Sequence, residues 1–204
     1  MSYTLNPIAV RLDRVIRKLG SGDAALAAEL AAEFADEAEE LDEMAAEAAE
    51  DRGIPPLTLS GAFEHLIVGG ERQQKLGFVY GYAFAYLCQH LGDWLDNTLW
   101  SGVAGSNRYM ERIDAELGRL GIDRKTLSTV ALTARGAPVE LPRIDDFPSL
   151  SHLRLPEVTQ AGAALAAVDL ASVSDAEVRD AIAEVKRWFD ECVAARADFF
   201  AYYC

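Results

Sequence analysis

The stretch LGFVYGYAFAYLCQH, residues Leu76–His90, carries no charged side chain and is apolar on nearly every side. A helix of this composition is buried all round rather than amphipathic. The stretch is too short to span a bilayer, which takes about 20 apolar residues. It therefore predicts a buried helix at the centre of the fold, extending over about 75–95.

Two rows of side chains run along this predicted helix. Gly77, Gly81 and Ala85 recur every four positions and so lie on one face, where another backbone could approach closely. Bulkier residues form a parallel row on a different face, at Phe78, Tyr82, Tyr86 and His90.

The composition excludes some classes of partner. The 204 residues carry 33 acidic and 19 basic side chains, for a formal net charge of −14. This charge argues against binding to nucleic acid or to an anionic membrane surface, because both need an excess of cationic groups. It leaves a basic protein as a possible partner.

The cysteines and the chain start favour a cytoplasmic protein. Cys88, Cys192 and Cys204 are odd in number and widely spaced, which is typical of reduced thiols. Cys88 lies in the apolar stretch, so we expect a buried, unreactive thiol there. No signal peptide and no segment long enough for a membrane anchor is recognised.

Most of the acidic excess lies in one segment. Between Asp23 and Asp51 there are twelve acidic residues and no Lys or Arg, on an alanine-rich pattern that predicts one long helix over about 23–51. The acidic face can be a solvated surface that only keeps the protein soluble. It can also be a docking surface for a cationic partner, and the residues proposed for that role are Glu33, Asp36, Glu37, Glu40 and Glu43.

The other segments predict further helices and one long loop. A proline-rich loop, pinned by regularly placed apolar residues, is expected over 135–156, and a C-terminal helix over about 175–203. Two segments leave strand and helix open: Ser2–Val10, where Pro7 would confine a strand to a sheet edge, and Ser128–Thr133. The fold class predicted is mainly α, a single domain over 1–204 formed as a helical bundle around the central helix, with at most a small β element.

Candidate catalytic residues gather at the end of the central helix. His90 and Asp93 are three positions apart and share a face that continues through Tyr86 and Tyr82. If His65 or Glu64 from the preceding helix meets that row, a pocket with acid–base capability results. The alternative is that His90 only ends a buried helix. No metal-binding or cofactor-binding motif occurs, so no metal and no cofactor is predicted.

Several short segments together span nearly the full length of the chain: LGSGD at 19–23, GYAF at 81–84, LCQHLG at 87–92, RGAP at 135–138, DDFP at 145–148, and the aromatic ending with Trp188 and FAYY at 200–203. In these segments the chain resembles an uncharacterised family of bacterial proteins common in actinobacteria. The resemblance implies no catalytic residues. The long acidic helix is unusual against the pattern of that family.

These observations lead to three hypotheses. The first is a non-enzymatic protein-binding module, of the immunity or antitoxin type, that meets a basic partner through the acidic helix. The second is an enzyme or small-ligand protein using Tyr82, Tyr86, His90 and Asp93. The third is a helical scaffold whose relevant surface is the loop at 135–156. The sequence leaves the oligomeric state open.

Overall fold

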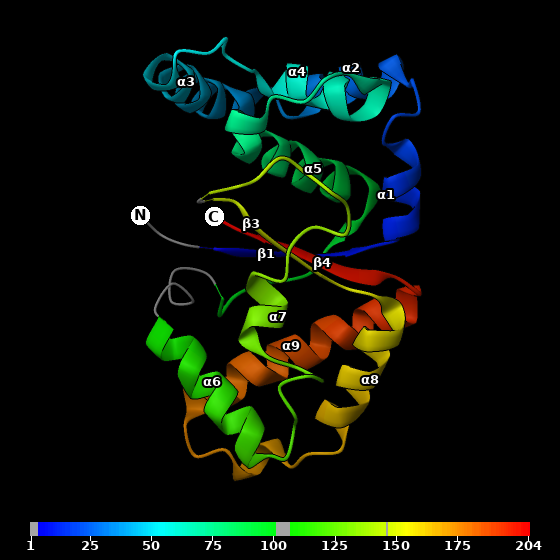
Figure 1. The fold of residues 1–204 in the computed structure, drawn as a ribbon. Coiled ribbons are helices and arrows are strands. Elements are labelled where there is room, and N and C mark those ends of the chain that lie inside the picture. Colours follow the sequence, from blue (N-terminus) through cyan, green and yellow to red (C-terminus); the bar gives the residue numbers. More distant parts are fainter. Residues whose placement is uncertain (1–3, 101–106, 146) are drawn as a thin grey trace. The chain divides into compact units, whose positions relative to one another are not determined.

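Helices account for 60% of this computed structural model, and a small four-stranded antiparallel sheet accompanies them (Figure 1). The structure describes residues 4–100, 107–145 and 147–204. The prediction of a mainly α fold with a small β element is therefore confirmed. Ser2, in the segment left open at the start of the chain, lies outside the described residues.

The chain divides into two compact units, each made of separate segments. Unit 1 contains residues 1–11, 92–138 and 150–204, and unit 2 contains residues 12–91 and 139–149. Two compact units can belong to one folding domain, so the single domain over 1–204 stays a prediction. A helical bundle of the whole chain around residues 75–95 is not confirmed, because unit 1 is built on the sheet.

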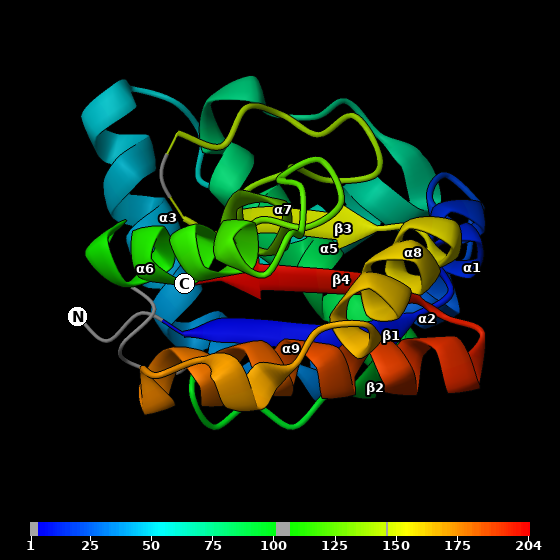
Figure 2. The ribbon, with the colours of Figure 1, turned by 90° about the horizontal axis from the view of Figure 1, so that it is seen from below.

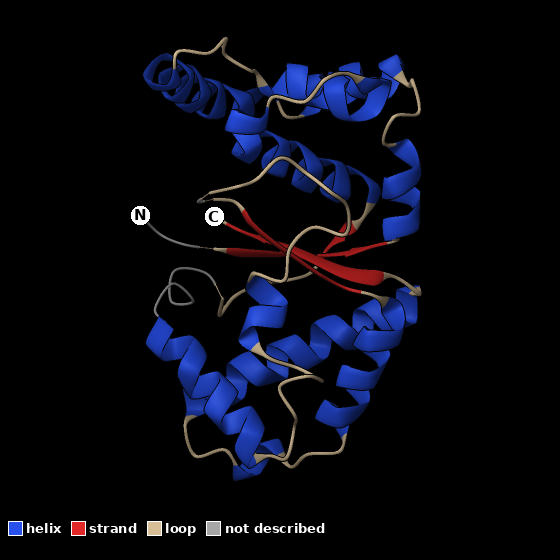
Figure 3. Ribbon diagram, viewed as in Figure 1, coloured by secondary structure: helices blue, strands red, loops and turns tan. Residues whose placement is uncertain are grey.

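The sheet joins the two ends of the chain. Strand β1 (Leu5–Val10) lies between β2 (Asp93–Trp94) and β4 (Asp198–Tyr203), and β3 (Ser149–Leu153) forms the far edge (Figure 2). Figure 3 colours these strands red. The antiparallel register of β1 and β4 places Leu5 opposite Tyr203 and Val10 opposite Asp198. Ser2–Val10 is thus resolved as a strand over its described part.

Four helices cover one face of this sheet (Figures 1 and 2): α6 (Asn107–Arg119), α7 (Thr129–Thr133), α8 (Leu155–Ala166) and α9 (Ala176–Ala195). The short 3-10 helix η3 (Leu170–Ser172) precedes α9. Alternate residues of β1 and β4 point into their shared core, among them Leu5, Ala9 and Phe199. Trp100 and Trp188 are fully buried there, and their ring centroids are 6.0 Å apart.

One buried carboxylate organises the loop after β2. Glu184 of α9 is only 3% exposed, and it accepts hydrogen bonds from the backbone N–H groups of Thr98 (2.9 Å) and Leu99 (3.0 Å). The Thr98 hydroxyl (2.8 Å) and the Arg187 guanidinium (3.1 Å) donate to the same carboxylate. A buried charge is tolerated when it is paired and hydrogen-bonded in this way, so Glu184 has a structural role.

Two predictions about the ends of the chain need correction. The C-terminal helix ends at Ala195 rather than near 203, because Arg196 adopts a left-handed conformation (φ 51°) and the aromatic residues that follow pair with β1. Pro7 does not confine β1 to an edge: its carbonyl accepts a bond from the Leu95 N–H (3.0 Å), on the side of the two-residue strand β2. A residue's N and carbonyl face the same side of a strand, so the missing N–H removes no bond to β4.

The open question at Ser128–Thr133 is resolved as a helix. Ser128 caps α7, and its hydroxyl accepts a hydrogen bond from the Ala131 N–H (3.2 Å). The predicted loop at 135–156 is shorter than expected, because β3 and the start of α8 occupy its second half.

Unit 2 is helical. Its elements are α1 (Leu12–Lys18), α2 (Ala24–Glu33), α3 (Ala35–Arg52), α4 (Leu59–Phe63), the π-helix η1 (Glu64–Gly69), the 3-10 helix η2 (Gln74–Leu76) and α5 (Gly77–Leu91). Helix α5 is buried along most of its length and packs against α1, α2 and α4. The expected buried helix is present, but it ends at Leu91 instead of near residue 95.

The long acidic helix predicted over 23–51 is two helices. Phe34 separates α2 from α3 with a non-helical backbone (φ −104°, ψ 29°), and its ring is buried. That ring stacks on Tyr86 of α5, with centroids 4.6 Å apart and planes 8° from parallel. Burial of the Phe34 ring against α5 accompanies the break between the two helices.

The row of small residues on α5 receives another backbone, as predicted. A Cβ atom on Gly77 would lie 2.0 Å from the Arg143 carbonyl oxygen, and one on Gly81 would lie 2.7 Å from Ile144 Cδ1 and 3.0 Å from Pro148 Cγ. Residues 139–149 therefore lie directly on the helix. At Gly77 the neighbouring atoms belong to the backbone, so only glycine leaves room for them; at Gly81 the neighbouring atoms belong to side chains.

This contact predicts a large cost for a single methyl group. Gly77→Ala should lower the free energy of unfolding by about 3 kcal/mol or more, because the new Cβ overlaps a backbone carbonyl that cannot rotate away. Gly118→Ala is the control: nothing lies within 4 Å of its Cβ position in α6, so the same change should stabilise by up to about 1 kcal/mol. Urea unfolding of both variants tests this, and equal effects would contradict it.

Candidate functional site

The two predicted sets of functional residues meet at one place in unit 2. His90 Nδ1, near the end of α5, lies 2.6 Å from Glu33 Oε2, at the end of α2. The neighbouring Tyr86 stacks on Phe34, and Tyr82 is 6.0 Å from Tyr86 between ring centroids. Glu33 was predicted as a partner-binding residue and His90 as a catalytic one. The structure instead pairs them with each other.

Asp93 does not share a helical face with His90. Helix α5 ends at Leu91, and Asp93 belongs to β2, where it pairs with Ala9. The change of structure follows from Gly92, whose Cβ position would lie 2.7–2.8 Å from atoms of Ile8, Ala9 and Val10. This close approach admits only glycine, and it places the next residues on the sheet.

His65 meets the central helix, but at a different residue from the predicted row. Its Nδ1 lies 2.8 Å from the hydroxyl of Tyr80, which is fully buried. The same hydroxyl accepts a hydrogen bond from the Gln73 N–H (2.9 Å). Glu64, the other candidate on this segment, is exposed.

Tyr80 is the residue that sequence reasoning missed. A signal was available, because a tyrosine in an entirely apolar helix needs a hydrogen-bond partner for its hydroxyl. Burial raises the pKa of this hydroxyl, so it stays protonated and remains a hydrogen-bond donor. Tyr80, His65 and the Gln73 N–H therefore form one small network beneath η1.

The acidic side chains of α3 form a continuous row on its outer face. Spacings of three and four residues align Asp36, Glu40, Glu43, Glu47 and Glu50, and we call these five the acidic row. All five are exposed, and within the described residues none forms an ion pair. The opposite face buries Leu41, Ala45 and Ala49. The row extends for about 20 Å at 1.5 Å per residue.

Two residues of α3 outside the acidic row also bear on partner binding. Met44 is 44% exposed and lies beside the row, on the same side of the helix as Glu37, which precedes it by seven residues. Asp42, on the inner side, is not available to a partner because its carboxylate accepts a hydrogen bond from the Leu59 N–H (2.6 Å). Of the five predicted partner-binding residues, Asp36, Glu40 and Glu43 belong to the row, Glu37 flanks it, and Glu33 is paired with His90.

The structure provides no assembled set of metal ligands in the part that it describes: no three His, Cys, Asp or Glu side chains gather as a metal site requires. Among the same residues, no helix combines the length and the apolar character needed to cross a bilayer. The third histidine, His152, lies 2.9 Å from the Gly136 carbonyl oxygen through its Nδ1.

The cysteines are in environments that suppress reactivity. Burial raises the pKa of Cys88 well above its usual range. Burial, with nearby Glu191 and Asp198, raises the pKa of Cys192 to about 12. Because the thiolate is the nucleophile, neither group is activated for covalent chemistry. Cys204, which is partly exposed, also has its pKa raised by burial.

This predicts the outcome of a thiol-labelling experiment. In the native Cys204→Ser variant at pH 7.5, Cys88 and Cys192 should not react with Ellman's reagent over hours, since the thiolate is both scarce and inaccessible. Unfolding in guanidinium should expose both. Rapid labelling of one thiol in the native variant would contradict the inert assignment.

The chain belongs to the family described as Domain of unknown function (DUF7691), which matches residues 1–204. The predicted membership of an uncharacterised family is confirmed to that extent. No curated protein and no solved structure matches the chain.

Proposed function

We propose that this member of the family is a non-enzymatic binding protein that docks a basic protein through the outer face of α3. The observation that carries the proposal is the acidic row, whose five exposed carboxylates have no ion-pair partner among the described residues. The exposed Met44 beside it offers an apolar contact, which favours a protein partner over a small cation.

The acidic row weakens the helix that carries it. Asp36/Glu40, Glu40/Glu43, Glu43/Glu47 and Glu47/Glu50 are like-charge pairs at three- or four-residue spacing. Each such pair costs an isolated helix roughly 0.2–0.5 kcal/mol. A cationic partner would relieve this repulsion on binding, so the row gains most from a partner of opposite charge.

An inhibitor of the immunity or antitoxin type fits this surface. Complementary charge acts mainly on the rate of association, and a protein that must capture a harmful enzyme benefits from rapid encounter. The alternative, an enzyme or small-ligand site at the central helix, has less support. Tyr86 is stacked on Phe34, His90 is paired with Glu33, and Asp93 lies on a strand.

The binding proposal is tested by a matched pair of charge reversals. Glu40→Lys/Glu43→Lys changes the acidic row, and Glu29→Lys/Glu111→Lys changes two exposed acids on α2 and α6 by the same total charge. Each protein is immobilised and used to capture proteins from native lysate, washed at low and then high salt. A basic protein should bind the wild type and the control, elute with salt, and be lost from the row variant.

Identical capture by all three proteins, or release that is independent of salt, would contradict docking through α3. Circular dichroism of the three proteins provides the folding control. We expect the row variant to be folded, because each new lysine gains acidic neighbours at helical spacing.

The repulsion between like charges within the acidic row also predicts a change in stability. Glu43→Lys should raise the free energy of unfolding by about 0.5–1 kcal/mol at low salt, since it turns repulsion with Glu39, Glu40 and Glu47 into attraction. The gain should shrink in 1 M NaCl, where the Debye length is about 3 Å. Thermal or urea unfolding at the two salt concentrations measures it; a loss of stability at low salt would show that Glu43 has a structural role.

A further inference from the structure

The buried hydroxyl of Tyr80 determines the protonation state of His65. Tyr80 accepts a hydrogen bond from the Gln73 N–H at 2.9 Å, so its own proton must be donated elsewhere. Within the described residues, His65 Nδ1 at 2.8 Å is its one available acceptor. Nδ1 accepts only when it carries no proton. The network therefore requires a neutral His65, protonated on Nε2.

A second proton on His65 is incompatible with this arrangement. Both ring nitrogens of a charged imidazole are donors, so Tyr80 would face two donors while its own O–H lost its acceptor. The hydroxyl is completely buried, and a buried unpaired donor is strongly unfavourable. Protonation of His65 thus favours separation of η1 from Tyr80.

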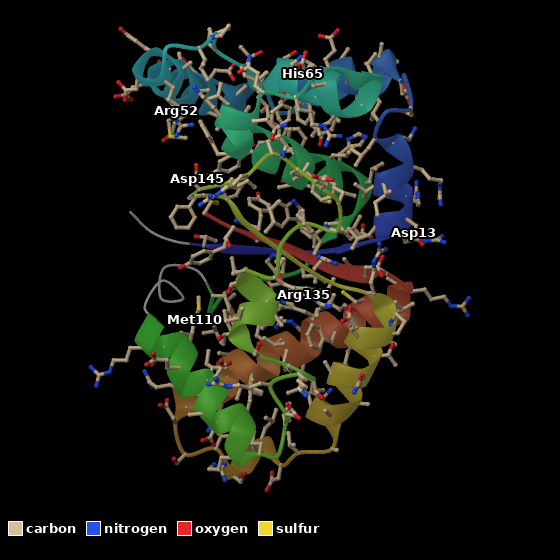
Figure 4. All side chains as sticks on the ribbon, viewed as in Figure 1. Asp13, Arg52, His65, Met110, Arg135 and Asp145 are labelled. Atoms are coloured by element: carbon tan, nitrogen blue, oxygen red, sulfur yellow. The ribbon has the colours of Figure 1, made fainter. Side chains whose placement is uncertain are left out.

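Residues 70–76, which end in the 3-10 helix η2, connect this network to the rest of unit 2, and we call them the 70–76 turn. Gln73 fixes it to Tyr80, and the Arg72 guanidinium donates to the Glu140 carbonyl oxygen at 2.8 Å. Arg52, at the C-terminal end of α3, donates to the Lys75 carbonyl. Figure 4 labels His65 and Arg52 in this unit. The turn therefore links His65 to the helix that carries the acidic row.

Opening of the turn is favoured by one of its own atoms. The side-chain oxygen of Gln73 is buried without a hydrogen-bond partner in the described part of the chain. An opened turn lets this oxygen bind water, which offsets part of the cost of the lost contacts.

Titratable and charged groups lie on most of the segments around His65. Helix α2 carries Glu29 and Glu33, helix α5 carries Tyr80, Tyr82, Tyr86, Cys88 and His90, and α4 carries none. The remaining groups are Glu64 on η1, Glu71 and Arg72 in the turn, and Lys18 and Asp23 beside Gly20 and Gly22. Glu33 is paired with His90, and Lys18 with Asp23. Glu29 and Glu64 are exposed to solvent screening, and the cation of Arg72 acts on Tyr80.

We propose that His65 and Tyr80 form a proton-sensitive latch: protonation of His65 releases the 70–76 turn and loosens the C-terminal end of α3. The latch is closed while His65 is neutral and opens when the imidazole takes up a second proton, because Nδ1 then becomes a donor. Regulation of partner docking by this latch rests on the proposed function of α3. The conformational change itself can be measured without a partner.

Hydrogen exchange of the Gln73 amide tests the latch directly. In the wild type, the protection factor of this amide, corrected for the pH dependence of free amide exchange, should fall about tenfold between pH 7.5 and 5.5, the loss expected for one hydrogen bond to a buried group. Amides at 50–53 should lose protection in parallel. In His65→Gln, whose side-chain oxygen accepts the Tyr80 proton at either pH, protection should not depend on pH.

His90→Gln is the matched control, because it removes the other histidine of unit 2 and should keep the wild-type response at Gln73. Tyr80→Phe should give low protection at both pH values; if it does not fold, the comparison of wild type with His65→Gln decides. A constant protection factor in the wild type, or the same fall in His65→Gln, overturns the latch. Neither result bears on capture of a basic partner at pH 7.5, so the two proposals can fail separately.

Discussion

The antiparallel pairing of β1 with β4 is the constraint on which unit 1 depends. It joins residues 5–10 to residues 198–203, so the first and last regular elements of the chain are neighbours. Backbone bonds between Thr4 and Cys204 extend the pairing beyond both strands. The inward residues of these strands contribute to the core that α9 and its neighbours cover, and β2 attaches to β1. Loss of the β1–β4 pairing would remove the sheet surface against which these helices pack.

The sequence predicted well those features that depend on short-range pattern. The uncharged stretch around Tyr82 predicted a buried helix, and the four-residue repeat of Gly77 and Gly81 predicted a close backbone approach. Both inferences rest on one segment alone. What the repeat could not supply was the identity of the approaching segment, residues 139–149, because it is more than 50 positions away in the chain.

The features that were missed depend on distant partners. Residues 198–203 have an aromatic pattern that fits either a helix face or a strand, and pairing with β1 decides between them. Phe34 occurs within an alanine-rich run whose pattern predicts one helix, and the stacking of its ring on Tyr86, a residue more than 50 positions away, accompanies the break. Asp93 left the predicted face of His90 because Gly92 fits closely against β1. The candidate site was altered by the same cause, since Glu33 and His90 were predicted for separate roles and proved to be each other's partner. The exposed acids of α3 needed no distant contact, which is why their placement could be inferred.

The division of the chain into interleaved segments affects the order in which the protein can form during translation. Residues 12–91 interrupt unit 1 between its first and second strands, so β1 is synthesised long before β4, its partner over the whole length of the strand. Unit 2 can assemble its helices much sooner, and it is complete once residues 139–149 have emerged. Between the synthesis of β1 and that of β4, therefore, β1 has only the two-residue strand β2 to pair with, and an incompletely paired strand edge of this kind favours aggregation.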